Sequence, residues 1–233
     1  KDSPLASMVE IAAALFIPVA LSLQLPTQLH VTVMEKETGL HDLQRSHGMT
    51  ALTYRCASAA FNLTVYSAVA LFLSLAGRAL GLQFFVETGP GILAAFLTGW
   101  GLSLVALAFF LSACTHDSRV AGVVGYTIVL FGTGFGLMVC QGVYGDTGLR
   151  EQSPVMPPAL NLWPQFAMIR AVYLLNFECA AKQECATAFS GHPELARSVG
   201  FLFLDAVLLA LAGVYLEEVL PSPGGLAPRH PLF

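Results

Sequence analysis

Charged residues are scarce in this sequence. Asp, Glu, Lys and Arg make up 11% of the 233 residues, whereas hydrophobic residues make up 55%. A typical soluble domain carries about 25% charged residues, so this composition cannot cover a chain of this size with a water-soluble surface. The formal net charge of −4 also excludes the basic field that nucleic-acid binding needs. We therefore expect an integral, multi-pass membrane protein with no nucleic-acid partner.

The common sequence signatures of enzymes are also missing. The chain contains no Gly-x-x-x-x-Gly-Lys-Ser/Thr phosphate loop, no His-Glu-x-x-His metal motif and no Gly-x-Ser-x-Gly nucleophile motif. Its five cysteines form no Cys-x-x-Cys pair and no Cys/His spacing that suits zinc. We expect no catalytic residue, no metal site and no cofactor site in this chain, although intramembrane enzymes can assemble a site from residues that are distant in sequence.

Long apolar runs, in contrast, are abundant. A helix rises 1.5 Å per residue, so about 20 apolar residues cross a hydrocarbon core of about 30 Å. Five segments meet this criterion: 8–33, 56–77, 90–114, 120–142 and 198–217. Pro18 and Pro26 lie in the first segment, and each removes one backbone hydrogen bond, so we expect kinks there. The predicted fold is an all-α polytopic membrane protein with about five transmembrane helices.

Residues 143–197, between the fourth and fifth spans, have a different character. The apolar piece 155–177 contains Pro157, Pro158 and Pro164 together with Arg170, which makes it too broken and too polar for a plain span. We interpret it as a re-entrant or interfacial helical hairpin. Non-helical backbone at membrane depth is tolerated only against protein or water. The alternative is an ordinary extracellular loop that carries a surface helix.

A charged segment, residues 34–49, follows the first span directly, and the next apolar run begins at Cys56. The segment is long enough for about four helical turns. On such a helix Glu37 and His41 can meet, and Leu40 and Leu43 share a stripe. A polar helix held between two membrane helices cannot move without moving both. The residues alone leave two interpretations open, a coupling helix docked on a partner and an interfacial helix that anchors a loop.

Two features lie inside the predicted spans. Asp205 is the one formal charge well within a span, where a carboxylate costs roughly 3 kcal/mol on insertion scales. It should face the bundle or a wet cavity, either as part of a substrate pathway or as a packed or protonated acid without a transport role. Gly132 and Gly136 form a Gly-x-x-x-Gly spacing, which permits close approach of helices and predicts tight internal packing.

Cys179 and Cys185 lie six residues apart in a polar stretch of the 143–197 region. If that region faces an oxidising compartment, the two thiols could close a small disulfide loop. The geometry that a disulfide requires cannot be judged from the sequence, so both the bridged and the free states remain open.

Three segments, considered together, resemble the membrane domains of the A subfamily of ATP-binding-cassette (ABC) transporters. They are Glu35-Lys36-Glu37 through Gly48-Met49, Pro158-Ala159-Leu160-Asn161-Leu162 through Tyr173-Leu174-Leu175, and Val214-Tyr215-Leu216-Glu217-Glu218-Val219-Leu220-Pro221 followed by Gly224-Gly225. In that subfamily the first segment touches the ATPase, the second precedes the last span and the third leaves the last span toward the nucleotide-binding domain. The order and spacing of the three segments are more specific than any one of them.

The resemblance implies an organisation for the whole chain. Residues 1–217 would form a partial transmembrane domain that lacks its first span, with residues 34–55 cytoplasmic and residues 143–197 on the other side. Residues 218–233 would be a linker toward a nucleotide-binding domain outside this chain, which would carry ATP and Mg. Since the sequence begins at Lys1 in mid-pattern, we expect a piece of a longer protein.

The resemblance also implies a function and partners. The complete protein would be an ATP-hydrolysing translocase for lipids or other amphipathic molecules. Its partners would be the nucleotide-binding domain, a second transmembrane half and membrane lipids. The residues implied to contact the nucleotide-binding domain are Glu35, Lys36, Glu37, Leu40 and Leu43. Two alternatives remain, an ABC exporter of a non-lipid cargo and a membrane scaffold or regulator that transports nothing.

Overall fold

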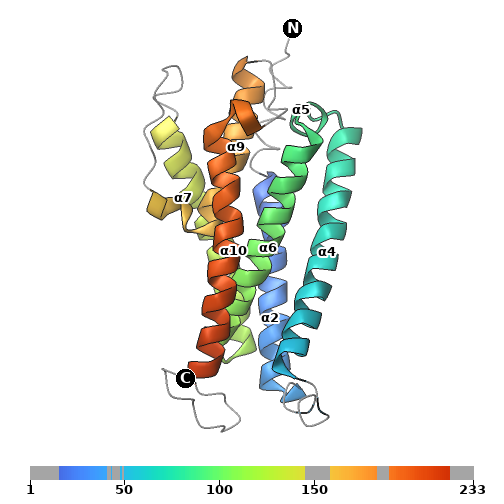
Figure 1. Ribbon diagram of the computed structural model, residues 1–233, viewed down its shortest axis with the longest axis vertical. Coiled ribbons are helices and arrows are strands. Elements are labelled where there is room, and N and C mark those ends of the chain that lie inside the picture. Colours follow the sequence, from blue (N-terminus) through green and yellow to red (C-terminus); the bar gives the residue numbers. More distant parts are fainter. Residues whose placement is uncertain are drawn as a thin grey trace.

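The protein is a bundle of helices in a computed structural model that describes residues 16–40, 43, 48, 50–144, 158–182 and 189–220. No strand occurs among these residues. Residues 16–22 are helical and lead into α2. The helices, shown in Figure 1, are α2 (Gln24–Glu37), α4 (Ala51–Ala79), α5 (Gln83–Val86), α6 (Pro90–Cys114), α7 (Ser118–Tyr144), α8 (Pro158–Asn161), α9 (Pro164–Lys182) and α10 (Pro193–Val219), with a short 3₁₀ helix η1 (Phe189–Gly191).

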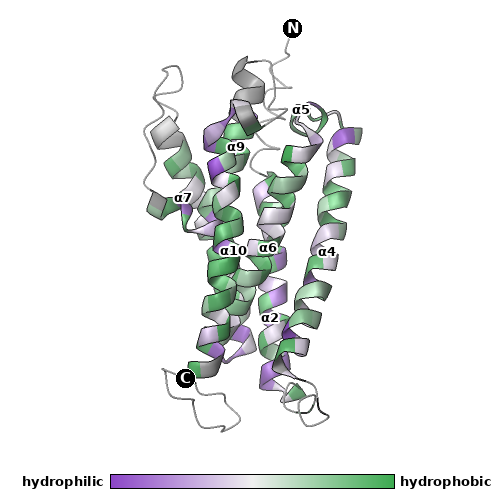
Figure 2. Ribbon diagram, viewed as in Figure 1, coloured by the Kyte–Doolittle hydropathy of each residue, from purple (hydrophilic) through white to green (hydrophobic). Residues whose placement is uncertain are grey.

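Four described helices are long and apolar enough to cross a membrane, which confirms the predicted all-α polytopic class. They cover Leu52–Ala79, Pro90–Cys114, Ser118–Cys140 and Pro193–Glu217. They coincide with the second to fifth predicted spans and extend most of them by a few residues. The first predicted span, 8–33, falls partly outside the described residues, and its described part is helical from residue 16. Figure 2 shows hydrophobic colours along α4 and α10 and more hydrophilic colours near the lower ends of α2 and α10.

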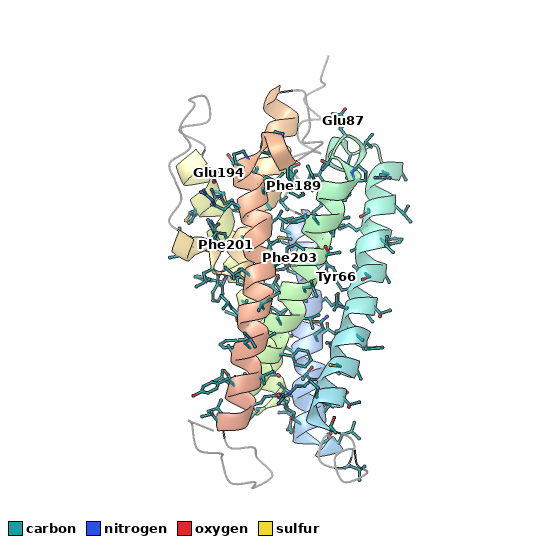
Figure 3. All side chains as sticks on the ribbon, viewed as in Figure 1. Tyr66, Glu87, Phe189, Glu194, Phe201 and Phe203 are labelled. Carbon is teal, nitrogen blue, oxygen red and sulfur yellow. The ribbon has the colours of Figure 1, made fainter. Side chains whose placement is uncertain are left out.

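Helix α6 is the central element of the bundle. It packs against α10, α2, α4 and α9, and its aromatic side chains Phe96 and Trp100 are fully buried. Gly99 lies against Leu202 and Phe203, and Gly213 lies against the backbone of Phe110, so α6 and α10 run parallel along their length. In Figure 3, Tyr66 lies between α4 and α6, where its hydroxyl donates to the Leu97 carbonyl oxygen at 3.0 Å.

A break in the first span follows from Pro26. Proline has no N–H, so the Ser22 carbonyl oxygen loses its helical donor four residues later, and the helix is interrupted at Leu23. Leu23 keeps a right-handed helical conformation, with φ −61° and ψ −14°, so the chain continues in nearly the same direction. Pro26 then packs closely on α7, since a Cβ added at Gly125 would lie 2.7 Å from its Cα.

Within the 155–177 region, α9 lies inside the bundle and not on its surface, and the re-entrant or interfacial hairpin stays a prediction. Every side chain from Phe166 to Val172 is buried. Gln165 donates to Thr133 at 3.2 Å, and Thr133 lies fifteen residues beyond Ser118 on α7, or about 22 Å along that helix. Helix α9 therefore starts about halfway along α7, and Figure 1 shows it running to the upper end of the bundle, where α10 begins.

The predicted continuous helix over residues 34–49 is interrupted at Gly39. Helix α2 extends to Glu37, and Gly39 has φ +71°, a left-handed conformation that ends helices. Glu35, Lys36 and Glu37 are thus the last turn of the first span. Leu40 and Leu43 are again helical, with the Leu43 N–H donating to the Gly39 carbonyl oxygen at 3.1 Å.

Candidate functional site

Five helices converge at the lower end of the bundle in Figure 1. The end of α2, the start of α4, the end of α6, the start of α7 and the end of α10 are joined there by polar side chains. The charged last turn of α2 lies at the centre of these contacts. We consider this end of the molecule as the candidate site because it contains the residues that the sequence singled out.

An ionic cluster of Lys36, Arg55 and Glu217 connects three helices. Lys36 Nζ lies 2.6 Å from Glu217 Oε1, and Arg55 Nε lies 2.8 Å from Glu217 Oε2. Their side chains keep 20–24% of their exposure, so the pairs are half-buried. Lys36 also donates to the carbonyl oxygen and to Oγ of Ser112, both at 3.2 Å. All three N–H donors of the Lys36 ammonium group are thereby used within the bundle.

The two glutamates beside Lys36 bind other helices. Glu35 Oε2 accepts from the Tyr54 hydroxyl at 2.5 Å, which ties α2 to the start of α4. Glu37 Oε2 accepts from the Ser118 backbone N–H at 3.1 Å, and Ser118 is the first residue of α7. A carboxylate at a helix N-terminus satisfies an N–H group that has no intrahelical partner and interacts favourably with the helix dipole. The predicted Glu37–His41 contact involves a residue outside the described part of the chain.

These contacts refine the sequence interpretation of Glu35, Lys36 and Glu37. Their charged groups reach helices of their own chain, which holds the end of α2 in a fixed place. Leu40 and Leu43 differ, because their side chains are 40% and 56% exposed and lie beyond the Gly39 turn. An exposed pair of leucines next to a fixed helix end is suited to contact a partner.

Asp205 lies at the centre of α10 on its buried stripe, with Leu202 and Ala206 as buried neighbours. The residue is 1% exposed, and neither carboxylate oxygen has a hydrogen-bond partner in the described part of the protein. The structure therefore places Asp205 far from the ionic cluster at the end of the same helix. Whether it belongs to a transport pathway is a separate question from coupling.

The proposed disulfide lies outside what the structure describes. Cys185 is not among the described residues, and only the backbone of Cys179 is. Cys56, Cys114 and Cys140 are free thiols. Within the described ranges, no three His, Cys, Asp or Glu side chains come together in a group that could hold a metal ion.

A second polar site, which the sequence interpretation did not predict, stabilises the start of α10. The Arg170 guanidinium is 1% exposed; it pairs with Glu194 and donates to Asn161 Oδ1 at 3.1 Å. Arg170 thus sits in the membrane part of the chain because its charge is paired there. In Figure 3, Glu194 lies at the upper part of the bundle, away from the ionic cluster.

The sequence interpretation also missed the role of Glu217, Arg55 and Tyr54 at the candidate site. Glu217 is separated from Lys36 by 181 positions, so no local pattern connects them. One signal was present: opposite charges at the ends of two predicted spans that were expected on the same side of the membrane. Pairing those ends would have suggested an ion pair between Lys36 and Glu217.

Comparison with known proteins places the chain among membrane transporters. The family model described as ABC-2 family transporter protein matches residues 1–215. ABC transporter A family member 9 of Dictyostelium discoideum is 28% identical over 94% of the chain, and A family member 7 of the same organism is 32% identical over 94%. A family member 7 of Arabidopsis thaliana is 26% identical over 94%. The chain spans about a quarter of the length of these relatives, 25%, 25% and 23% respectively.

Proposed function

Because this chain belongs to the ABC-2 family of transporter proteins, we propose that it is the membrane-spanning part of an ATP-driven transporter of the A-subfamily type. Its cargo would be lipids or other amphipathic molecules. In this proposal the chain binds no nucleotide itself. A nucleotide-binding domain would supply ATP and Mg, and a second transmembrane half would complete the transporter.

The observation that carries the proposal is the convergence of four helices on the last turn of α2. Glu35 holds α4, Lys36 holds α10 and α6, and Glu37 holds α7. A displacement of this turn therefore reaches most of the bundle through direct polar contacts. That is the arrangement a membrane domain needs if an ATPase is to change its conformation from one end.

Leu40 and Leu43 would be the contact with the nucleotide-binding domain. They come directly after the last turn of α2 and expose apolar surface. Burying that surface against a partner lowers the free energy of the complex. In this proposal, Leu40 and Leu43 receive the force from the ATPase, and Glu35, Lys36 and Glu37 transmit it to the neighbouring helices. The interfacial-anchor interpretation instead places the same leucines in the lipid headgroup region.

Two features support a cargo that reaches the protein from the bilayer. Helix α4 exposes large apolar side chains along its length, among them Phe61, Phe72 and Leu75, so lipid chains can contact the bundle directly. The A-family relatives cover almost the whole chain, and the resemblance to that subfamily implies lipid-like cargo.

A second candidate is transport of an organic anion. A mouse protein named ABC-type organic anion transporter ABCA8A is 30% identical over 60% of the chain, which is 8% of its own length. The two cargo classes share the same coupling apparatus, so they differ only in the molecules that stimulate hydrolysis. Parallel assays with phospholipid and with an amphipathic organic anion separate them.

The proposal is tested with Leu40→Asp combined with Leu43→Asp in the full-length transporter, purified and reconstituted in liposomes. Charged side chains in the contact should weaken docking of the ATPase. We expect normal insertion, and a joint fall of cargo-stimulated hydrolysis and of cargo transport. Leu80→Asp is the matched control, because Leu80 is an exposed leucine at the opposite end of α4.

Unchanged cargo-stimulated transport in the Leu40/Leu43 variant would show that this segment does not couple hydrolysis to transport. Poor insertion of that variant with normal insertion of Leu80→Asp would support the anchor interpretation. A full-length protein without any cargo-stimulated ATPase would favour the scaffold or regulator function.

A further inference from the structure

We propose that Glu217 is a positioning residue that makes the last span move with the end of the first, through its ion pair with Lys36. This inference rests on the function proposed above and deepens it, since it names the joint by which the coupling segment reaches α10. Neither the family match nor the resemblance assigns such a role to either residue.

Glu217 has the contacts that a joint requires. Its two carboxylate oxygens bind cations from two other helices, Lys36 of α2 at 2.6 Å and Arg55 of α4 at 2.8 Å. Charge-assisted hydrogen bonds of this length are stronger than neutral ones. A single side chain of α10 thus holds both of the helices that flank the coupling segment.

The ion pair joins helices whose main packing partners differ. Helix α2 packs chiefly on α7 and α6, whereas α10 packs chiefly on α6 and α9. The bond from Lys36 to Glu217 is therefore a direct link between the coupling segment and α10, in addition to the indirect route through α6. Since Lys36 also holds Ser112 near the end of α6, the ends of all three helices are fixed to one ammonium group.

Glu217 also lies near the end of α10. It is two residues before Val219, the end of α10, and Leu220 then leaves the helix with an extended conformation, φ −78° and ψ 136°. Gly99 contacts Leu202 and Gly213 contacts Phe110, so α10 packs closely on α6 over much of the length of α10. Close-packed interiors are poorly compressible and transmit strain, so a pull on Glu217 reaches the centre of the bundle.

Two charge-removing variants distinguish the joint from simple stabilisation. Lys36→Gln removes the link to α2 and leaves Glu217 paired with Arg55. Arg55→Gln removes the link to α4 and leaves Glu217 paired with Lys36. Each variant leaves the carboxylate with one cation, and Lys36→Gln in addition gives up the two hydrogen bonds from Lys36 to Ser112 of α6, so the thermal midpoint of each variant is measured beside its coupling. The two variants differ in whether the last turn of α2 is still bound to α10: it is bound in Arg55→Gln and not in Lys36→Gln.

The measurement is the number of cargo molecules moved per ATP hydrolysed by the full-length transporter in liposomes, together with the thermal midpoint of each variant. For Lys36→Gln we expect this ratio to fall by about fivefold or more, the lower end of typical coupling effects. Arg55→Gln should keep most of the ratio, and Lys36→Arg, which keeps the charge, should restore it. Arg197→Gln, which breaks an exposed ion pair with Glu194 at the opposite end of α10, should leave the ratio unchanged.

An unchanged ratio in Lys36→Gln would overturn the inference, as would equal losses in Lys36→Gln and Arg55→Gln. If Lys36→Gln does not fold, Glu217→Asp, which keeps the charge but shortens the side chain by one methylene, weakens the links to Lys36 and Arg55 together; a ratio no lower than that of Arg55→Gln would then overturn the inference. Failure of the proposed function appears differently, because the Leu40/Leu43 variant would then transport normally. A coupled protein that depends on Leu40 and Leu43 but not on Lys36 would reject only the inference.

Discussion

Among single residues, Asp205 carries the clearest energetic cost. Its carboxyl group lies at the centre of α10, is 1% exposed and has no partner in the described part of the protein. Helix α6, the main packing partner of α10, contains no charged residue between Pro90 and Cys114. A buried polar group without a hydrogen bond costs about 1–3 kcal/mol. The residue is therefore tolerated by the bundle and does not stabilise it.

We predict that Asp205→Asn preserves expression and transport, and that Asp205→Val raises the free energy of unfolding by about 1–3 kcal/mol, because it removes that cost. Thermal unfolding in lipid nanodiscs measures the stability, and liposome assays measure the transport. A large loss of transport in well-folded Asp205→Asn protein would instead place this carboxyl group in the cargo pathway.

Residue roles could be predicted from the sequence only where they depend on near neighbours. The spacing of Leu40 and Leu43 placed them on one stripe, whereas their exposure is seen only in the structure. The internal use of Glu35, Lys36 and Glu37 could not be predicted, because Tyr54, Ser118 and Glu217 reach them only after the helices have packed. The sequence also could not explain a charged Arg170 within an apolar piece, because its partner Glu194 comes from another helix.

At the scale of elements, the contact between α7 and α9 shows what the Gly-x-x-x-Gly spacing does. A Cβ added at Gly132 would lie 2.8 Å from Gln165 Cγ, and one at Gly136 would lie 2.6 Å from Ile169 Cδ1. Gly132 and Gly136 are four residues apart, and so are Gln165 and Ile169, so one ridge of α9 fits into one groove of α7. The sequence predicted close packing at these glycines, but it could not tell which helix would occupy the groove.

We predict that Gly136→Ala destabilises the protein by about 1–3 kcal/mol through overpacking. Ile169→Val removes the atom that the new methyl group would meet, so the double variant should be more stable than Gly136→Ala alone. Gly134→Ala is the control, since a Cβ there has no atom within 4 Å. Additive effects in the Gly136/Ile169 cycle, measured by thermal unfolding in detergent, would show that the two residues do not compete for space.

The ends of a helix could be predicted from the sequence where the length of an apolar run alone determines them. The span predicted at 90–114 is α6 itself, with Pro90 at its start. The charged segment was less predictable, because Gly39 adopts a left-handed conformation that divides it. A glycine inside a helical pattern can be tolerated or can end the helix, and local sequence does not decide between these outcomes.

At the scale of the whole molecule, the two ends of the bundle are chemically different. The lower end in Figure 1 carries the ionic cluster and the last turn of α2, and the upper end carries Arg170 with Glu194 and the end of α9. Glu87 lies at that upper end in Figure 3. The basic residues of the loops do not decide the orientation of the bundle in the membrane.

We predict that Thr38 and Asp117 face one side of the membrane and that Glu87 and Gly191 face the other. Single cysteines at these exposed positions, in a cysteine-free background, are labelled in sealed vesicles with an impermeant maleimide. Thr38→Cys and Asp117→Cys should react together, and Glu87→Cys and Gly191→Cys only from the opposite side. Labelling of Thr38→Cys and Glu87→Cys from the same side would refute the arrangement.

The missing hydrogen bond at Pro26 divides the first span into two parts with different attachments. Above the break, Ser22 accepts from Gln165 at 3.0 Å, which anchors that part to α9. Below it, the helix ends in the turn that binds four neighbours. A missing hydrogen bond is a place where a helix bends, so a displacement of the lower part can be absorbed between Ser22 and Pro26 without pulling Ser22 away from Gln165.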